Sequence, residues 1–233
     1  AVGVGGAFLG TQMFYKISKK YSRLAALSLT FFVGALGSVV LFYSLVIDSF
    51  ILLMIGALIL GFGQSATLQS RYAASFVASE KFKATALSLA VWFSVFGSVF
   101  GPRLVSVYSD YFDNLFNSEL IVGYIVAMVG MLFASASVLT FTSSNSSLRK
   151  PAEVEEVAEK AIKSKKDGNI LTLLLVLNHF TMVVIMSATP LHVQDIGETV
   201  ELVGVIISYH TLGMFLLSPI LGNYVDKYGY KNF

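Results

Sequence analysis

The chain has 233 residues, of which 55% are hydrophobic and 13% charged, with a formal net charge of +2 and no cysteine. A mean hydropathy of +0.74 is too high for a soluble domain, which needs more charge to cover its surface. The lack of cysteine excludes disulfides, metal thiolates and thiol nucleophiles, and a small net charge that comes from the loops gives no indication of a nucleic-acid partner.

The first apolar segment, residues 1–14, is too short to cross a bilayer, because as a helix it would reach only ~21 Å. We interpret it as the remnant of a longer helix. No basic region precedes it, so nothing in it indicates a cleavable signal peptide.

Six longer apolar runs follow, and each holds about twenty residues. A helix rises ~1.5 Å per residue, so about twenty residues cross the ~30 Å hydrocarbon core of a bilayer. We therefore predict an all-α, polytopic membrane helix bundle with one partial and six complete crossings. In chain order the complete crossings are 24–46, 50–70, 84–104, 120–141, 170–190 and 202–221.

The basic residues alternate between the gaps that separate these runs. Of the sixteen Lys and Arg residues, fifteen fall in every second gap, and only Arg103 falls in one of the others. Cytoplasmic loops of membrane proteins carry an excess of Lys and Arg. We therefore predict a multi-pass protein of the cell membrane, with 16–23, 71–83, 149–166 and the C-terminal end in the cytoplasm.

The second complete crossing carries polar side chains in its later half. Gln64 and Gln69 could offer amide groups to a solute, and Arg71 could attract an anion or anchor the helix at the lipid headgroups. Arg71 lies about 21 residues, or ~31 Å, from the outer end of the helix, and this depth favours the anchor.

The third complete crossing contains the sequence Gly-Ser-Val-Phe-Gly-Pro at residues 97–102. Gly97 and Gly101, four residues apart, would let another helix approach closely, and Pro102 removes a backbone hydrogen bond and permits a bend. Simple helix packing and a role in gating both fit this pattern.

The longest polar stretch, residues 142–168, divides the chain. In it Glu156 and Lys160, and Glu159 and Lys163, are spaced four apart and would support a solvated helix by a few tenths of a kcal/mol per pair. We predict a helix bundle over 1–141, a cytoplasmic linker over 142–168, and the start of a second bundle over 169–233.

The last two crossings carry polar residues at membrane depth, where burial costs several kcal/mol unless they find partners or a wet cavity. Asn178 and His179 lie about nine residues, ~13 Å, from the cytoplasmic end, and Tyr209 and His210 lie about eight residues, ~12 Å, from the outer end. The histidines could face one cavity and carry a proton, or each could form an interhelical hydrogen bond without a role in transport.

Residues 222–231 resemble the loop motif G-x-x-x-D-R/K-x-G-R/K-R/K of the major facilitator superfamily, with Gly222, Asp226, Lys227 and Gly229 at its defining positions. Residues 97–102 resemble the start of the G-x-x-x-G-P motif on helix 5 of antiporters in that family. Residues 61–63 match the glycine portion of its helix 4 motif, but Ala57 stands where that motif has Arg.

By this resemblance the chain is a fragment that covers family helices 2 to 8. The resemblance implies a transporter that moves a small solute by alternating access, is secondary active, and works with protons or in efflux. Independently, a carboxylate such as Asp226 at a cytoplasmic helix end could pair with Arg or Lys or cap a neighbouring helix, and this contact could break in another state.

Other classes of protein fit less well. The sequence has no H-E-x-x-H, P-loop or Gly-x-Ser-x-Gly motif, so we expect no enzyme, metal or cofactor. A seven-helix receptor or light sensor is an alternative by helix count, but a retinal protein needs a Lys in its last helix and residues 202–221 contain none. A membrane scaffold without transport activity is the other alternative.

Overall fold

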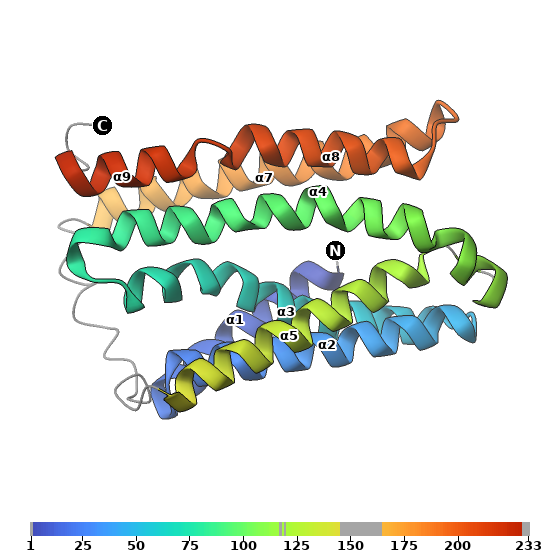
Figure 1. Cartoon of the computed structure of the whole chain (residues 1–233), viewed down its shortest axis with the longest axis horizontal. Helices are drawn as coiled ribbons and strands as arrows, with labels where there is room; N and C mark the ends of the chain where they lie inside the picture. Colours follow the sequence, from blue (N-terminus) through green and yellow to red (C-terminus); the bar gives the residue numbers. More distant parts are fainter. Residues whose placement is uncertain (1, 117, 119, 145–164, 230–233) are drawn as a thin grey trace. The chain divides into compact units, whose positions relative to one another are not determined.

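Figure 1 shows the computed structural model of the chain, which describes residues 2–116, 118, 120–144 and 165–229. The described residues form helices and no strands, which confirms the predicted all-α class. The helices are α1 (Val2–Lys20), α2 (Arg23–Val46), α3 (Phe50–Val77), η1 (Glu80–Phe82), α4 (Lys83–Phe116), α5 (Ile121–Ser144), α7 (Lys165–Asp195), α8 (Val200–Phe215) and α9 (Ser218–Tyr228).

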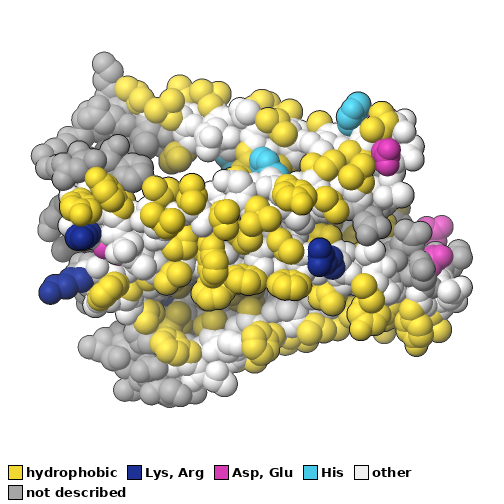
Figure 2. Space-filling model, turned by 45° about the horizontal axis from the view of Figure 1, so that its top comes forward, with side chains coloured by type: hydrophobic (Ala, Val, Ile, Leu, Met, Phe, Trp, Pro, Cys, Tyr) yellow, Lys and Arg dark blue, Asp and Glu magenta, His cyan; other side chains and the backbone are white. Residues whose placement is uncertain are grey.

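Within these described ranges, six stretches are long and apolar enough to cross a membrane. Figure 2 shows hydrophobic side chains spread along the helices, with few charged side chains between them. Such exposed apolar surface suits contact with lipid rather than with water. The pairs predicted in the linker, Glu156 with Lys160 and Glu159 with Lys163, lie outside the described residues.

The chain divides into two compact units, one formed by Ala1–Ala152 with Thr211–Phe233 and the other by Glu153–His210. The first unit therefore holds α1 to α5, the end of α8 and α9. The second holds α7 and most of α8, joined by a turn in which Gly197 adopts a φ of +79°, a conformation that favours glycine. The predicted division into two bundles by residues 142–168 stays a prediction.

Serine side chains start two of the helices in the first unit. The Ser22 hydroxyl accepts a hydrogen bond of 3.0 Å from the Ala25 N–H at the start of α2, and the Ser49 hydroxyl accepts one of 3.4 Å from the Leu52 N–H at the start of α3. Serine at this position satisfies one of the free N–H groups of the first turn and stabilises a helix by about 1 kcal/mol.

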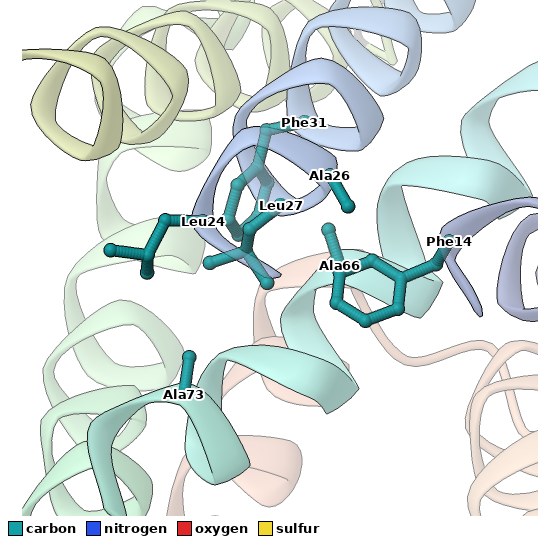
Figure 3. Packing of buried hydrophobic residues seen from close by; sticks show 7 residues of the cluster. All are labelled: Phe14, Leu24, Ala26, Leu27, Phe31, Ala66 and Ala73. Atoms are coloured by element: carbon teal, nitrogen blue, oxygen red, sulfur yellow. The ribbon is translucent and has the colours of Figure 1, made fainter. Parts of the chain in front are cut away.

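The core of the first unit lies where α1, α2 and α3 meet. In Figure 3 the Phe14 ring from α1 lies beside Ala66 of α3. Nearer the N-terminus of α1, a Cβ at Gly6 would overlap the Leu58 carbonyl, so this contact between α1 and α3 requires glycine. The buried hydrophobic residues of this core are Phe14, Leu24, Ala26, Leu27, Phe31, Ala66 and Ala73.

A pair of buried hydroxyls joins α2 to α5. The oxygens of Ser28 and Ser135 lie 3.0 Å apart, and each hydroxyl also lies 3.0 Å from the backbone carbonyl oxygen of the other residue. Hydrogen bonds between membrane helices contribute about 0.6 kcal/mol on average. The pair therefore fixes the register of the two helices more than it adds stability.

Several helices extend beyond the predicted apolar runs, since α3 continues to Val77 rather than 70 and α7 spans Lys165–Asp195 rather than 170–190. Two further differences concern α4 and the last run. The apolar run at 84–104 continues as α4 to Phe116, past Pro102 and through part of the loop expected on the outer side, because no further proline or glycine follows to end it. The run at 202–221 is divided at residues 216–217, and α9 then continues to Tyr228. Pro219 stands in the first turn of α9, where its missing N–H costs nothing.

Candidate gate at the start of α4

The helix α9 lies beside the first turns of α4 (Figure 1), and a carboxylate from α9 binds the first turn of α4. Asp226 Oδ1 accepts a hydrogen bond of 2.9 Å from the Ala84 N–H, and Oδ2 accepts one of 2.7 Å from the Thr85 N–H. The first N–H groups of a helix have no partner within it, and the helix dipole makes this end positive. The carboxylate therefore satisfies two free donors and complements the dipole.

The fold of α9 brings one of its faces against α4. Ser218, Gly222 and Asp226 are spaced four residues apart and so lie on one face of the helix. The Ser218 hydroxyl lies 3.2 Å from the carbonyl oxygen of Ser88 and 2.7 Å from that of Phe215, and it shares its hydrogen between these two acceptors. A Cβ at Gly222 would overlap the Ser88 hydroxyl and lie 2.7 Å from the Ala84 carbonyl oxygen. The absence of a side chain at Gly222 thus allows the approach that Asp226 needs.

Two further motif residues form the end of α9. Lys227 Nζ lies 5.2 Å from the ring centroid of its neighbour Tyr228. Gly229 adopts a φ of +79°, which L side chains rarely adopt, and its N–H donates a 2.9 Å hydrogen bond to the Val225 carbonyl. Of the two arrangements considered for Asp226, the structure has the helix cap, and Lys227 lies beside an aromatic ring.

The polar side chains expected on α3 differ in their exposure on the protein surface. Gln64 is exposed, whereas Gln69 and Arg71 are half-buried. The Arg71 guanidinium carbon lies 6.0 Å from the centroid of the Phe215 ring at the end of α8. The structure therefore places Arg71 beside an aromatic residue that no sequence pattern pairs with it.

The glycines expected to pack closely in α4 are open. No described atom outside the helix lies within 4 Å of the place that a Cβ would take at Gly97 or Gly101. Pro102 is half-buried, and α4 continues through it. Neither close packing nor gating at these glycines is decided by the described residues, and both stay predictions.

The four polar residues of the last crossings all have exposed side chains. Asn178 and His179 lie on α7, and Tyr209 and His210 lie on α8, within the second unit. Tyr209 has 72% of its surface exposed. Their predicted roles in solute binding and proton transfer stay predictions.

Three residues of the α4 contact were not found from the sequence: Ala84, Thr85 and Ser88. The first two contribute backbone N–H groups, which every residue other than proline carries, so no residue type marks them. The spacing of Ser218, Gly222 and Asp226 was the available signal, since it indicates a helix that continues beyond residue 221.

The chain is similar throughout its length to a known family. The family model described as Major Facilitator Superfamily matches residues 1–233. No solved structure gives a significant match.

Three relatives match most of the chain. YdeG and YddS of Bacillus subtilis (strain 168), both described as uncharacterized MFS-type transporters, are each 31% identical, over 227 and 224 residues. These matches cover 92% and 91% of this chain but 52% and 51% of the relatives. The riboflavin transporter RfnT of Brucella anthropi is 24% identical over 229 residues, which cover 96% of this chain and 56% of that protein. The chain spans about half the length of these relatives.

Proposed function

Because the chain belongs to the major facilitator superfamily, we propose that the protein moves a small solute across the membrane by alternating access, and that Asp226 holds its cytoplasmic side closed in one state. The family and the six apolar stretches found among the described residues make it a multi-pass membrane protein. Family membership favours transport over the receptor and scaffold alternatives.

The observation that carries the gate is the double hydrogen bond from Ala84 and Thr85 to Asp226. Hydrogen bonds to charged groups contribute about 1.5–3 kcal/mol each, and the helix dipole adds about 0.3–1 kcal/mol. A contact of this size holds two helices together in one state and is still weak enough to break once per transport cycle. Water can replace the carboxylate at the start of α4 when the helices part.

The placement of this gate follows from charge. Lys227 and Lys231 follow Asp226 closely, Arg71 stands near the end of α3, and Lys81 and Lys83 lie in η1 and at the first position of α4. Basic residues mark cytoplasmic loops, so this end of both helices faces the cytoplasm in the proposed orientation. The protein is then a carrier of the cell membrane whose inner side closes when α9 docks on α4.

For the solute and the energy source, we propose a chemical class of solute and a type of transport rather than a specific compound or ion. One of the relatives is named for its solute, riboflavin, and it also contains a match to nearly all of this chain. We infer a small organic solute, moved by secondary active transport, with His179 and His210 as candidate proton carriers. We propose efflux as the direction, because residues 97–102 resemble the start of the helix 5 motif of antiporters in this family.

A reversible cross-link tests the gate. The chain contains no cysteine, so Ser88→Cys combined with Ser218→Cys would introduce a single pair across the α4–α9 contact, in a whole protein freed of any other cysteine. We expect oxidation to stop solute flux in proteoliposomes and a reductant to restore it. Each single variant is the control. A cross-linked protein that transports at the full rate would contradict the proposed gate.

A further inference from the structure

Arg71 is a basic residue on the membrane-crossing helix α3, and among the described residues it has an aromatic neighbour but no acidic partner. Resting on the proposed transport function, we propose that Arg71, together with Gln64 and Thr67, forms a solute-contacting stripe on α3 that binds an anionic group, a carboxylate or a phosphate. The stripe gives the proposed transporter a preference for anionic solutes.

The position of Arg71 leaves its hydrogen-bond donors available. The guanidinium carbon lies 6.0 Å from the Phe215 ring centroid, and the side chain is half-buried rather than extended away from the protein. An aromatic ring covers one face of a guanidinium, and the five N–H donors point outward in its plane. This planar fork matches the two oxygens of a carboxylate or a phosphate.

The same face of α3 carries two more polar groups. Gln64, Thr67 and Arg71 are spaced three and four residues apart, which places them along one side of the helix. Gln64 and Thr67 are both exposed. Gln64 lies about 14 residues, or ~21 Å, into α3, still within the ~30 Å hydrocarbon core, where an amide that faces lipid is costly. These side chains therefore suit a water-filled path better than a lipid surface.

The charges of the crossing helices favour an anion along that path. In the six apolar stretches of the described chain, Asp226 is the single Asp or Glu, and its carboxylate is occupied at the start of α4. An anionic solute beside α3 would be attracted by Arg71 and would meet no free carboxylate, whereas a cationic solute would be repelled by Arg71.

An anionic lipid headgroup has the same chemistry as an anionic solute, and the test separates the two. The intact transporter is placed in nanodiscs of phosphatidylcholine, with or without phosphatidylglycerol. Its thermal unfolding is then measured with matched solutes: benzoate and benzamide, nicotinate and nicotinamide, phenyl phosphate and phenol. Arg71→Gln removes the charge, and Arg71→Lys keeps the charge without the planar fork. Arg23→Gln is the matched control, because Arg23 lies 5.0 Å from the Phe76 ring in a similar contact.

We expect at least one anion to stabilise the wild type more than its neutral partner does, in phosphatidylcholine alone. Arg71→Gln should lower the anion affinity about tenfold, which corresponds to about 1.4 kcal/mol, Arg71→Lys should lower it less, and Arg23→Gln should leave it unchanged. The inference is overturned if no anion is preferred, or if Arg71→Gln removes only a response to phosphatidylglycerol.

Uptake of the same solutes into proteoliposomes distinguishes the two proposals. If neutral solutes are taken up equally well by wild type and Arg71→Gln, transport stands and the anion site is wrong. If no solute is taken up by either protein, although protein is present in the vesicles, the transport function proposed above fails and the anion site fails with it.

Discussion

Asp226 shows how one side chain can join two helices that lie about 140 positions apart in the chain. A carboxylate has two equivalent acceptor oxygens, which match the two free N–H groups at the start of α4, and a negative charge, which matches the positive end of the helix dipole. Asparagine has the same shape but one acceptor, and its NH2 group would face an N–H donor. The charge and one hydrogen bond are therefore lost together.

We expect Asp226→Asn to weaken the docking of α9 by about 1–3 kcal/mol. A cysteine placed at Ser88, whose side chain is buried beneath α9, should then react several-fold faster with a membrane-impermeant maleimide applied from the cytoplasmic side. Asp113→Asn, at an exposed position of the same α4 helix, serves as the control and should leave the rate unchanged. An equal rate in the wild type and in Asp226→Asn would remove Asp226 from the gate.

The polar residues of the crossing helices show the limit of prediction at this scale. The sequence shows that Gln64, Arg71, His179 and His210 would be energetically costly to place in a membrane. This cost alone does not identify the residue that each of them contacts. That Phe215 lies next to Arg71 could be seen only in the structure, because nothing in the sequence distinguishes this phenylalanine from the other residues of its apolar run.

At the level of helices, the docking of α9 on α4 depends on a glycine. Gly222 is buried, and a methyl group there would overlap the Ser88 hydroxyl, which donates a hydrogen bond of 2.7 Å to the Ala84 carbonyl of the same helix. We expect Gly222→Ala to separate the helices even though Asp226 is intact, and to raise maleimide labelling at a Ser88→Cys position as Asp226→Asn does. Gly130→Ala on α5 is the matched control, because no described atom would contact its Cβ. Unchanged labelling in Gly222→Ala would contradict this prediction, because it would mean that α4 can shift to fit the methyl group while α9 stays docked.

Helix positions could largely be read from the sequence, because length and hydropathy determine which segments cross a membrane. Helix ends could not. The apolar pattern stops at Leu104 although α4 runs on to Phe116, because exposed polar residues do not interrupt a helix unless a turn residue follows. The break at 216–217 was also missed, since Leu216 and Leu217 are apolar and only Pro219 indicates a new first turn.

For the whole molecule, alternating access requires that the helices of both halves move around one solute site, and this chain spans about half the length of its relatives. The family was predictable because residues 222–231 carry its loop motif, and the multi-pass character was predictable because apolar runs of about twenty residues recur along the chain. The energy source was not, because coupling depends on titratable groups that need to face the same path.

The proposed proton coupling is therefore to be tested on the intact protein. The apolar stretches of the described chain contain no free carboxylate, which leaves His179 on α7 as the titratable group nearest the middle of its crossing. Histidine gains and loses a proton between about pH 5.5 and 8. If His179 carries the coupled proton, uptake by the wild type should change across this range, and His179→Ala should flatten the profile. His192→Ala, an exposed histidine in the last turn of the same helix, is the control and should keep the wild-type profile. A His179→Ala profile that matches the wild type would assign coupling to another group.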